Sequence, residues 1–410
     1  MISAREQLEI LRSGTEEILP EKEFLQKLER SVRTGKPLRI KQGFDPTAPD
    51  IHLGHAVGLR KLKQFQDLGH TIVLIVGNYT ALVGDPSGRS ATRPRLTHEA
   101  IESNAATYLE QFFRVLDPAG VEVVRNGDWF ASMNFEQVME LAAGFTIARL
   151  LERDDFEKRF REQRPISLHE LFYPIMQGHD SVVVRSDVEI GATEQKFNLL
   201  VGRQLQVDSG QEPQVIMTLP ILVGLDGVNR MSKSLGNYVG ISEAPDQMFG
   251  KIMSIPDDRL IHYYELATSL PPAEIGRIRR RLESKESHPR ALKADLGEHV
   301  VGLYHDRDKA RAARAEFDRV FRDGGLPDAI PEIRLKAPDG KLWIVQILAE
   351  AGLAPTRTEA RRLIRQNAVT VDDQPVASEE AWIPLDGASG RLVRVGKRRF
   401  ARIFREPVNN

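Results

Sequence analysis

The stretch LRIKQGFDPTAPDIHLGHAVGLRKLKQFQDLGHTIVLIV (residues 38–76) decides the fold class. Residues 38–44 read as a strand, and residues 51–69 have the pattern of a helix that ends at Gly69. The run TIVLIV (71–76) is almost entirely β-branched, as in a strand buried on both faces. This strand–helix–strand unit predicts an α/β fold with a doubly wound (Rossmann-like) parallel sheet.

The length and composition describe a globular protein with several domains. At 410 residues the chain exceeds one ordinary hydrophobic core, so we expect two or three domains. No apolar run approaches the roughly 20 residues of a membrane span. Residues 1–18 lack the apolar segment of a signal peptide, so we expect a cytoplasmic protein. The absence of cysteine excludes disulfides, a thiol nucleophile and cysteine zinc sites.

The pattern along the chain predicts four parts. Residues 97–180 are mostly helical in pattern and form an insertion, after which VIMTLPILVG (215–224) completes the sheet. The parts are an α/β domain (1–240), an all-helical, Arg-rich domain (241–325), a Gly-, Pro- and Asp-rich linker (326–340) and a small α+β module (341–410).

The last module is basic, whereas the rest of the chain is acidic. Residues 341–410 hold 12 Lys and Arg against 8 Asp and Glu, a net charge of +4, although the whole chain carries −1. Thr356 and Glu359 have the spacing of a capping box that starts a helix. The basic candidates are Arg357, Arg361 and Arg365, which form one stripe on that helix, and Lys397 and Arg398, beside the turn of a final hairpin. A polyanion partner and a solvated basic face both explain them.

The motif HLGH (52–55) lies at the predicted start of the first helix. His52 and His55 are three residues apart there, so they face the same way. A metal pair, a packing accident and a phosphate clamp are the possible interpretations. A zinc site would need further ligands, and neither HExxH nor a Cys/His cluster supplies them, so we expect no protein-held metal. A helix N-terminus binds anions, and Gly54 leaves room for a base or ribose.

The second basic motif is RMSKSLGN (230–237), after the last predicted strand of the sheet. Arg230 and Lys233 supply two cations, and Ser232 and Ser234 supply hydroxyls, on a glycine-flanked loop. Such a loop can close over a triphosphate and neutralise charge during displacement at phosphorus. An ordinary basic loop has the same composition.

The third motif is YPIMQGHD (173–180), in which Tyr173, Gln177 and Asp180 share one face of a helix. They could offer a hydroxyl, an amide and a carboxylate to a small zwitterion. An amphipathic helix with a polar face is the alternative interpretation.

HLGH and MSKS, each placed after a strand, together resemble the HIGH and KMSKS motifs of class I aminoacyl-tRNA synthetases. With GFDPTAPDIHLGH (43–55), VGDPSGRS (83–90) and YPIMQGHD, nearly the whole chain resembles the tyrosyl-tRNA synthetases. The C-terminal module resembles the S-four-type RNA-binding module, which bacterial tyrosyl enzymes carry and tryptophanyl enzymes lack. Lys41 and Arg230 replace a tyrosine and a lysine of the better-known branch, so the chain resembles a divergent bacterial branch.

This resemblance implies a role for each matching residue. The implied catalytic residues are His52, His55, Lys233, Arg230, Ser234 and Thr47. The implied ATP contacts are Asp45, Gly54, Gly191, Glu194, Met231 and Lys233. The implied tyrosine contacts are Lys41, Asp85, Tyr173, Gln177, Asp180 and Gln195, with Asp180 accepting a hydrogen bond from the phenol. A phenylalanine bound there would leave this carboxylate unpaired, which is costly.

The implied reaction is that of a tyrosine–tRNA ligase. Tyrosine attacks ATP, supplied with Mg²⁺, and the tyrosyl group passes from the adenylate to tRNA(Tyr). The resemblance also implies a homodimer with residues 97–180 at its interface. The same chemistry on tryptophan, and a non-catalytic RNA-binding paralogue, are the alternatives.

Overall fold

The structure is a computed structural model, and it describes residues 2–47, 50–87, 96–321, 330–385, 389–396 and 399–406. Its contacts divide the chain into two compact units, residues 1–311 and 312–410, each of which is described by itself. The four-part division predicted above is kept as a proposal.

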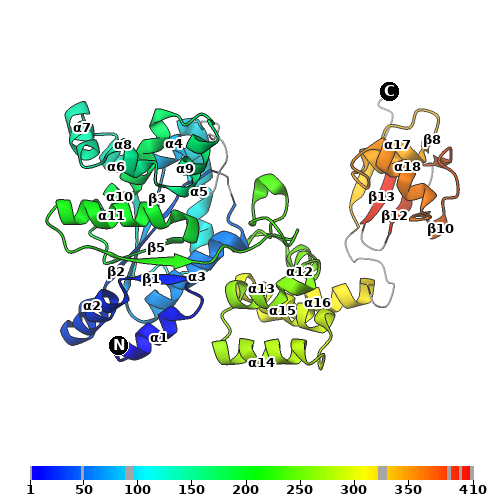
Figure 1. The fold of residues 1–410 in the computed structure, drawn as a ribbon. Coiled ribbons are helices and arrows are strands. Elements are labelled where there is room, and N and C mark those ends of the chain that lie inside the picture. Colours follow the sequence, from blue (N-terminus) through cyan, green and yellow to red (C-terminus); the bar gives the residue numbers. More distant parts are fainter. Residues whose placement is uncertain are drawn as a thin grey trace. The chain divides into compact units, whose positions relative to one another are not determined.

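The first unit is built on a six-stranded sheet (Figure 1). Its strands are β1 (Glu17–Leu19), β2 (Arg39–Phe44), β3 (Thr71–Val76), β4 (Val121–Arg125), β5 (Val188–Ala192) and β6 (Val215–Leu219). Their order is β1-β6-β5-β2-β3-β4; β1 runs antiparallel to β6, and all other pairs are parallel. The five parallel strands have the strand order of a doubly wound sheet, so the fold class is confirmed.

Helices cover both faces of this sheet. Figure 1 shows α10 (Tyr173–Val184) and α11 (Lys196–Asp208) on one face and α3 (Leu53–Asp67) on the other. The predicted end of α3 is confirmed, because Gly69 follows it with a φ of +87°, which favours glycine. The inner strand β3 is buried from Ile72 to Val76, which explains its continuous apolar sequence.

The other helices of the sheet domain are short or peripheral. They are α1 (Ala4–Arg12), α2 (Glu21–Thr34), α4 (Thr80–Val83), α5 (His98–Phe112), α6 (Gly127–Phe130), α7 (Phe135–Ala143), α8 (Ile147–Leu150) and α9 (Asp154–Arg161), with the 3-10 helices η1 (Leu168–Phe172), η2 (Thr193–Gln195) and η3 (Lys233–Leu235).

The region 97–180 differs from its predicted helical pattern at one place. Residues 121–125 form β4, the edge strand of the main sheet beside β3. Three of its five side chains are exposed or nearly so, as expected at an edge, and the sequence is too short to show a clear alternation. The consequence is that residues after β4 lie at the carboxyl edge of the sheet, close to the cavity described below.

Helices follow the sheet, as the pattern of residues 241–325 predicts. They are α12 (Pro245–Met253), η4 (Asp257–Arg259), α13 (Leu260–Ala267), α14 (Pro272–Glu283), α15 (Pro289–Tyr304) and α16 (Arg307–Phe321). Phe249 and Gly297 show how closely α12 and α15 pack, since a Cβ on Gly297 would lie 2.9 Å from the Phe249 ring.

The second unit contains a small α+β module. Its elements are β7 (Glu332–Leu335), β8 (Lys341–Trp343), α17 (Ile344–Glu350), α18 (Arg357–Arg365), β9 (Val369–Val371), β10 (Gln374–Pro375), β11 (Trp382–Pro384), β12 (Arg391–Val395) and β13 (Arg399–Arg405). The sheets have the orders β10-β9-β12-β13-β7 and β11-β8. The predicted final hairpin is confirmed as β12 and β13. The described part of the predicted linker contributes β7, which pairs with β13.

Of the two hydrogen bonds of the capping box predicted at the start of α18, one is formed. The Thr356 hydroxyl accepts the Glu359 backbone N–H at 3.1 Å, as an N-cap should. The Glu359 carboxylate bonds Arg362 at 2.6 and 2.7 Å instead of returning to the cap.

Candidate active site

A cavity of about 490 Å³ lies at the carboxyl ends of the parallel strands. Strands β2 and β5 are neighbours in the sheet, but their following helices, α3 and α11, cover different faces. Ligands of doubly wound folds bind at this switch point. Of the predicted site residues, the cavity wall contains Asp45, Thr47, His52, Gly54, His55, Asp85, Tyr173, Gly191, Glu194, Gln195, Arg230, Met231, Lys233 and Ser234.

The two histidines of HLGH converge at the start of α3. The rings of His52 and His55 stack with centroids 3.9 Å apart and planes 18° from parallel. A Cβ on Gly54 would lie 3.0 Å from the His52 ring, so glycine here clears space for the imidazole itself. The structure therefore places both rings beside the helix N-terminus, where backbone N–H groups attract anions.

His52 is poised as a neutral imidazole. Burial, followed by the nearby His55 and Lys233, holds the pKa of His52 well below its ordinary value. Among the described atoms, its Nδ1 is buried without a hydrogen-bond partner. A buried polar atom that lacks a partner is costly, and a ligand in the cavity is one way to satisfy it.

The basic loop after β6 lies beside the start of α3, since a Cβ on Gly54 would be 3.6 Å from Met231 Cβ. Met231 is buried and anchors the loop, and the Ser232 backbone N–H donates to Asn237 at 2.8 Å. Lys233 Nζ donates to Asp50 at 2.9 Å, which connects the loop to the chain just before α3. Ser232 and Ser234 share a hydrogen bond of 2.9 Å between their hydroxyls.

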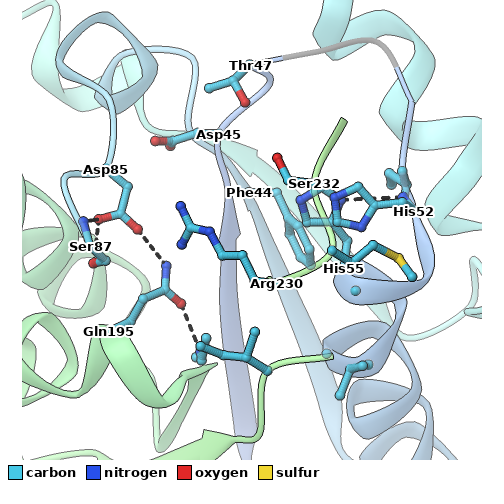
Figure 2. A pocket seen from close by; sticks show the side chains of 18 of the residues that line it. Phe44, Asp45, Thr47, His52, His55, Asp85, Ser87, Gln195, Arg230 and Ser232 are labelled. Carbon is cyan, nitrogen blue, oxygen red and sulfur yellow. Dashed lines mark hydrogen bonds between the residues drawn. The ribbon is translucent and has the colours of Figure 1, made fainter. Parts of the chain in front are cut away.

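Arg230 reaches across the cavity from this loop. Figure 2 shows its side chain in the middle of the space, with Asp85 and Gln195 on one side and the histidines on the other. Its guanidinium forms an ion pair with Glu194, which follows β5. Both side chains are about one-quarter to one-third exposed, so an incoming ligand can replace this contact.

A hydrogen-bonded carboxylate lies on the far side of Arg230. Asp85 accepts from Ser87 Oγ at 2.6 Å and from Gln195 Nε2 at 2.9 Å (Figure 2). Burial opposes its ionisation, but Arg153, Ser87 and Gln195 outweigh burial and hold the pKa of Asp85 below its ordinary value. Asp85 is therefore an anion that can meet a substrate cation.

Tyr173 links this region to the end of β2. Its hydroxyl donates to Asp45 Oδ2 at 2.9 Å, and Thr80 Oγ1 donates to the other oxygen of Asp45 at 2.7 Å. A second, much smaller cavity continues below Tyr173, and its wall includes Gln177 and Asp180. One face of α10 thus carries all three predicted residues of YPIMQGHD to this small cavity.

Asp180 is the buried end of the small cavity. It is 3% exposed and accepts from Trp129 Nε1 at 3.0 Å and Asn126 Nδ2 at 3.3 Å. Burial raises the pKa of Asp180 to about 7, against the charge of Lys41 and these two hydrogen bonds. Both donors stabilise the ionised carboxylate.

Asn126 and Trp129 are absent from the sequence-based site. They lie more than 50 residues before Asp180, in the segment NGDWF directly after β4. Recognition of residues 121–125 as a parallel strand would have placed them at the carboxyl edge of the sheet, where the site forms.

Lys41 is not among the described residues that line either cavity. Its ammonium is fully buried and donates to Gln177 O at 2.8 Å, Ser181 Oγ at 2.7 Å and Glu189 Oε1 at 2.8 Å. All three of its donors are engaged, so the expected direct contact with tyrosine is not formed by this arrangement.

The basic stripe of α18 is exposed but partly neutralised. Arg357, Arg361 and Arg365 are exposed, as predicted. Arg361 Nε lies 3.8 Å from Glu379, and Arg365 Nη2 donates to the same carboxylate at 3.2 Å. Lys397 and Arg398 lie outside the described residues.

No helix in the described ranges is both long and apolar enough to cross a membrane.

Two family models match the chain. Residues 33–322 match the model described as tRNA synthetases class I (W and Y). Residues 342–380 match the model described as the S4 domain. The first match covers strands β2 to β6 and the helices that follow the sheet, and the second covers α17, α18, β9 and β10 of the α+β module.

Curated relatives match over nearly the full length. A tyrosine–tRNA ligase of Moorella thermoacetica is 52% identical over 397 residues, 97% of this chain and 95% of the relative. A tyrosine–tRNA ligase of Carboxydothermus hydrogenoformans is 48% identical over 405 residues, 98% of each chain.

Solved structures share the fold. A C-terminally truncated mitochondrial tyrosyl-tRNA synthetase of Aspergillus nidulans has a TM-score of 0.64 at 22% identity, covering 78% of this chain and 95% of that chain. A tyrosyl-tRNA synthetase of Archaeoglobus fulgidus complexed with L-tyrosine has a TM-score of 0.62 at 22% identity, covering 76% and 100%.

Proposed function

The chain belongs to the class I tRNA synthetases for tryptophan and tyrosine, and we propose that its two connected cavities activate tyrosine with ATP and pass it to tRNA. It is an aminoacyl-tRNA synthetase with the function of a tyrosine–tRNA ligase, the activity named for its full-length curated relatives. The roles of individual residues, given below, are our proposal.

The small cavity is the amino-acid side of the site. Asp180 accepts the phenol O–H of tyrosine, while Asp85, Tyr173 and Gln177 surround the α-ammonium group. The observation that carries this assignment is Asp180 itself, a buried carboxylate held by Trp129 and Asn126. Bound phenylalanine has no phenol hydroxyl, so it would leave the Asp180 carboxylate without that hydrogen bond. The free-energy cost of an unpaired buried polar group gives the selectivity for tyrosine over phenylalanine.

The large cavity is the nucleotide side. His52 and His55 meet the phosphates of ATP at the start of α3, and Asp45, Gly54, Gly191 and Glu194 line the adenosine. ATP enters with its Mg²⁺ as the substrate complex. Because Arg230 contacts Glu194 across the cavity, the two side chains must separate when the ribose binds. Arg230 is then released toward the phosphates together with Lys233.

The first step is a displacement at phosphorus. The carboxylate of tyrosine attacks the α-phosphate, the bond to the bridging oxygen breaks, and pyrophosphate leaves with the electron pair. The attacking group is already an anion, so the protein supplies position and charge rather than a general base. His52, His55, Lys233 and Arg230 stabilise the negative charge that develops on pyrophosphate, and Thr47 and Ser234 are expected to hydrogen-bond the phosphates.

The second step transfers the tyrosyl group to the terminal ribose of tRNA(Tyr). The S4 module, with its exposed arginines on α18, is the proposed contact with the RNA backbone. We expect the enzyme to act in the cytoplasm.

A homodimer is the proposed assembly. Large apolar side chains are exposed on the helices that precede α10: Phe135 (78%), Met139 (55%), Ile147 (64%), Phe160 (64%) and Leu168 (71%). A surface of this kind favours a protein partner, and a second copy of the chain would cover it. Sedimentation at micromolar concentration should give twice the monomer mass.

Pyrophosphate exchange into ATP, measured with each of the twenty amino acids, tests the proposal. We expect exchange with tyrosine and much less with phenylalanine. Exchange with tryptophan alone would favour the related tryptophan activity. No exchange with any amino acid would indicate a non-catalytic RNA-binding protein.

A further inference from the structure

Beneath the small cavity lies a buried ion pair, Lys41 on β2 and Glu189 on β5. Both side chains are at most 1% exposed, and Lys41 Nζ lies 2.8 Å from Glu189 Oε1. The two remaining donors of Lys41 bond Gln177 O and Ser181 Oγ, which both belong to α10. The pair therefore ties the helix that carries the amino-acid site to the two strands at the switch point.

Glu189 also determines how the Gln177 side chain is turned. Gln177 Nε2 donates to Glu189 Oε1 at 3.0 Å, and Gln177 Oε1 accepts from Asn198 Nδ2 at 2.9 Å. A carboxylate beside an ammonium accepts hydrogen bonds and does not donate them, so the amide nitrogen of Gln177 must face it. The amide oxygen is then presented on the other side, which suits an ammonium group.

The same pair acts on Asp180, three residues further along α10. Lys41 favours the ionised carboxylate, whereas Glu189 opposes it more weakly. The other groups that face Asp180 are Asn126 and Trp129, which do not titrate in the relevant range. The neighbouring His179 has its pKa lowered by burial and by Lys41, so near neutral pH its ring is uncharged.

We propose that Lys41, through its pair with Glu189, is a positioning residue for tyrosine selection: it fixes the amide of Gln177 and the turn of α10 that carries Asp180, without contacting the substrate. This inference rests on the proposed function. It replaces the direct contact expected from the sequence, and it makes Lys41 a determinant of tyrosine affinity and not of ATP affinity.

The test compares Lys41→Met with Lys27→Met in the full chain by pyrophosphate exchange. Lys27 is also a buried lysine, 2% exposed and 3.3 Å from Asp187, but Asp187 lies at the opposite end of β5 from the cavity. For Lys41→Met we expect the KM for tyrosine to rise about tenfold or more, with the KM for ATP within about twofold. Lys27→Met should leave both KM values near those of the wild type.

The pH profile provides a readout that lost stability alone would not move. In the wild type, kcat/KM for tyrosine should rise with pH through the pKa of Asp180, which is about 7. Lys41→Met removes the charge that lowers this pKa, so the midpoint should move to higher pH. In Lys27→Met the midpoint should stay where it is in the wild type.

A buried carboxylate left alone can prevent folding, so the double variant Lys41→Met/Glu189→Gln is tested beside the single variant. Circular dichroism establishes that each variant is folded. An amide at position 189 can donate as well as accept, so it no longer fixes the orientation of the Gln177 side-chain amide. The double variant should therefore keep the raised KM for tyrosine. A folded single or double variant with wild-type KM and wild-type preference for tyrosine over phenylalanine would overturn the inference. Absence of tyrosine-dependent exchange in the wild type would instead refute the proposed function.

Discussion

At the scale of single residues, Asp180 is the proposed determinant of which amino acid is bound. Asp180→Asn keeps the size of the side chain but replaces a charge-assisted hydrogen bond to the phenol, which contributes about 1.5–3 kcal/mol. We expect the KM for tyrosine in pyrophosphate exchange to rise roughly 10- to 150-fold, and the KM for ATP to change little. The preference over phenylalanine should fall by a similar factor, because asparagine makes no comparable bond to either substrate.

Asp187→Asn is the matched control. Asp187 is another hydrogen-bonded carboxylate, less buried than Asp180, and it accepts from the Arg39 backbone N–H at the other end of β5. Its KM for tyrosine should equal that of the wild type. A similar loss in both variants would show that Asp180 acts through stability and not through the substrate.

The stacked histidines, His52 and His55, are proposed to act on the phosphates of ATP and not on the amino acid. His55→Ala should slow adenylate formation roughly 100-fold, since donors aimed at developing negative charge have effects of this size. The dissociation constant for tyrosine, measured by equilibrium dialysis without ATP, should stay near that of the wild type. Equal losses in rate and tyrosine affinity would contradict the phosphate role.

The contact between the rings of His52 and His55 predicts that substitutions of the two residues have non-additive effects. Because His52 and His55 stack at 3.9 Å, each substitution also disturbs the other ring. The double variant His52→Ala/His55→Ala should therefore lose less activity than the product of the two single losses, a coupling typical of residues in contact. Independent effects would indicate that the rings act on separate groups.

Most of the residues that the sequence predicted for the site line one of the two cavities, because they come in short motifs at strand and helix ends. It could not identify Asn126 and Trp129, whose importance depends on contacts with a helix more than 50 residues away. Lys41 shows the converse limit: the family resemblance implied a contact with tyrosine, but its ammonium bonds acceptors on α10 and β5, and Lys41 lines neither cavity.

At the scale of elements, segments with a clear apolar pattern were predictable, and a segment without one was not. Strand β3 and helix α3 were found because a continuous apolar run and a 15-residue amphipathic helix leave clear patterns. Strand β4 was missed because five residues at a sheet edge leave no clear alternation. The polar ends of these elements, and not their apolar centres, build the site.

The loop 230–237 is an element with two states in the proposed reaction. In the structure, Arg230 contacts Glu194 and Lys233 contacts Asp50, so both cations of the loop are held by carboxylates. Glu194→Gln removes the ion pair with Arg230. A partly exposed ion pair of this kind stabilises the held state of the loop by about 0.2–1 kcal/mol. Trypsin should then cut after Arg230 or Lys233 about 1.4- to fivefold faster than in the wild type.

Glu243→Gln serves as the comparison for this loop. Glu243 pairs with Lys251 at 2.6 Å outside the loop, so its substitution should not change cleavage at Arg230 or Lys233. If Glu194→Gln were cleaved no faster than the wild type, the contact between Arg230 and Glu194 would not restrain the loop.

At the scale of the whole molecule, chemistry and RNA binding are expected to reside in different parts of the chain. The cavities lie entirely within residues 42–234, whereas the S4 match covers residues 342–380. Pyrophosphate exchange requires only tyrosine and ATP, so it should not depend on the basic face of α18. Aminoacylation also requires tRNA, and only this reaction should respond to the α18 arginines.

The last prediction tests that separation in the full-length protein. Replacement of Arg357, Arg361 and Arg365 by alanine should leave pyrophosphate exchange unchanged and raise the KM for tRNA. The slope of log Kd for tRNA against log salt concentration should become shallower. Because Glu379 already contacts Arg361 and Arg365, the change in slope should be smaller than three phosphate contacts would give. Arg362→Ala, on the same helix but paired with Glu359, is the control and should bind tRNA as the wild type does. Loss of pyrophosphate exchange in the triple variant would mean that the module supports the catalytic unit, whereas an unchanged KM for tRNA would place the RNA contact elsewhere.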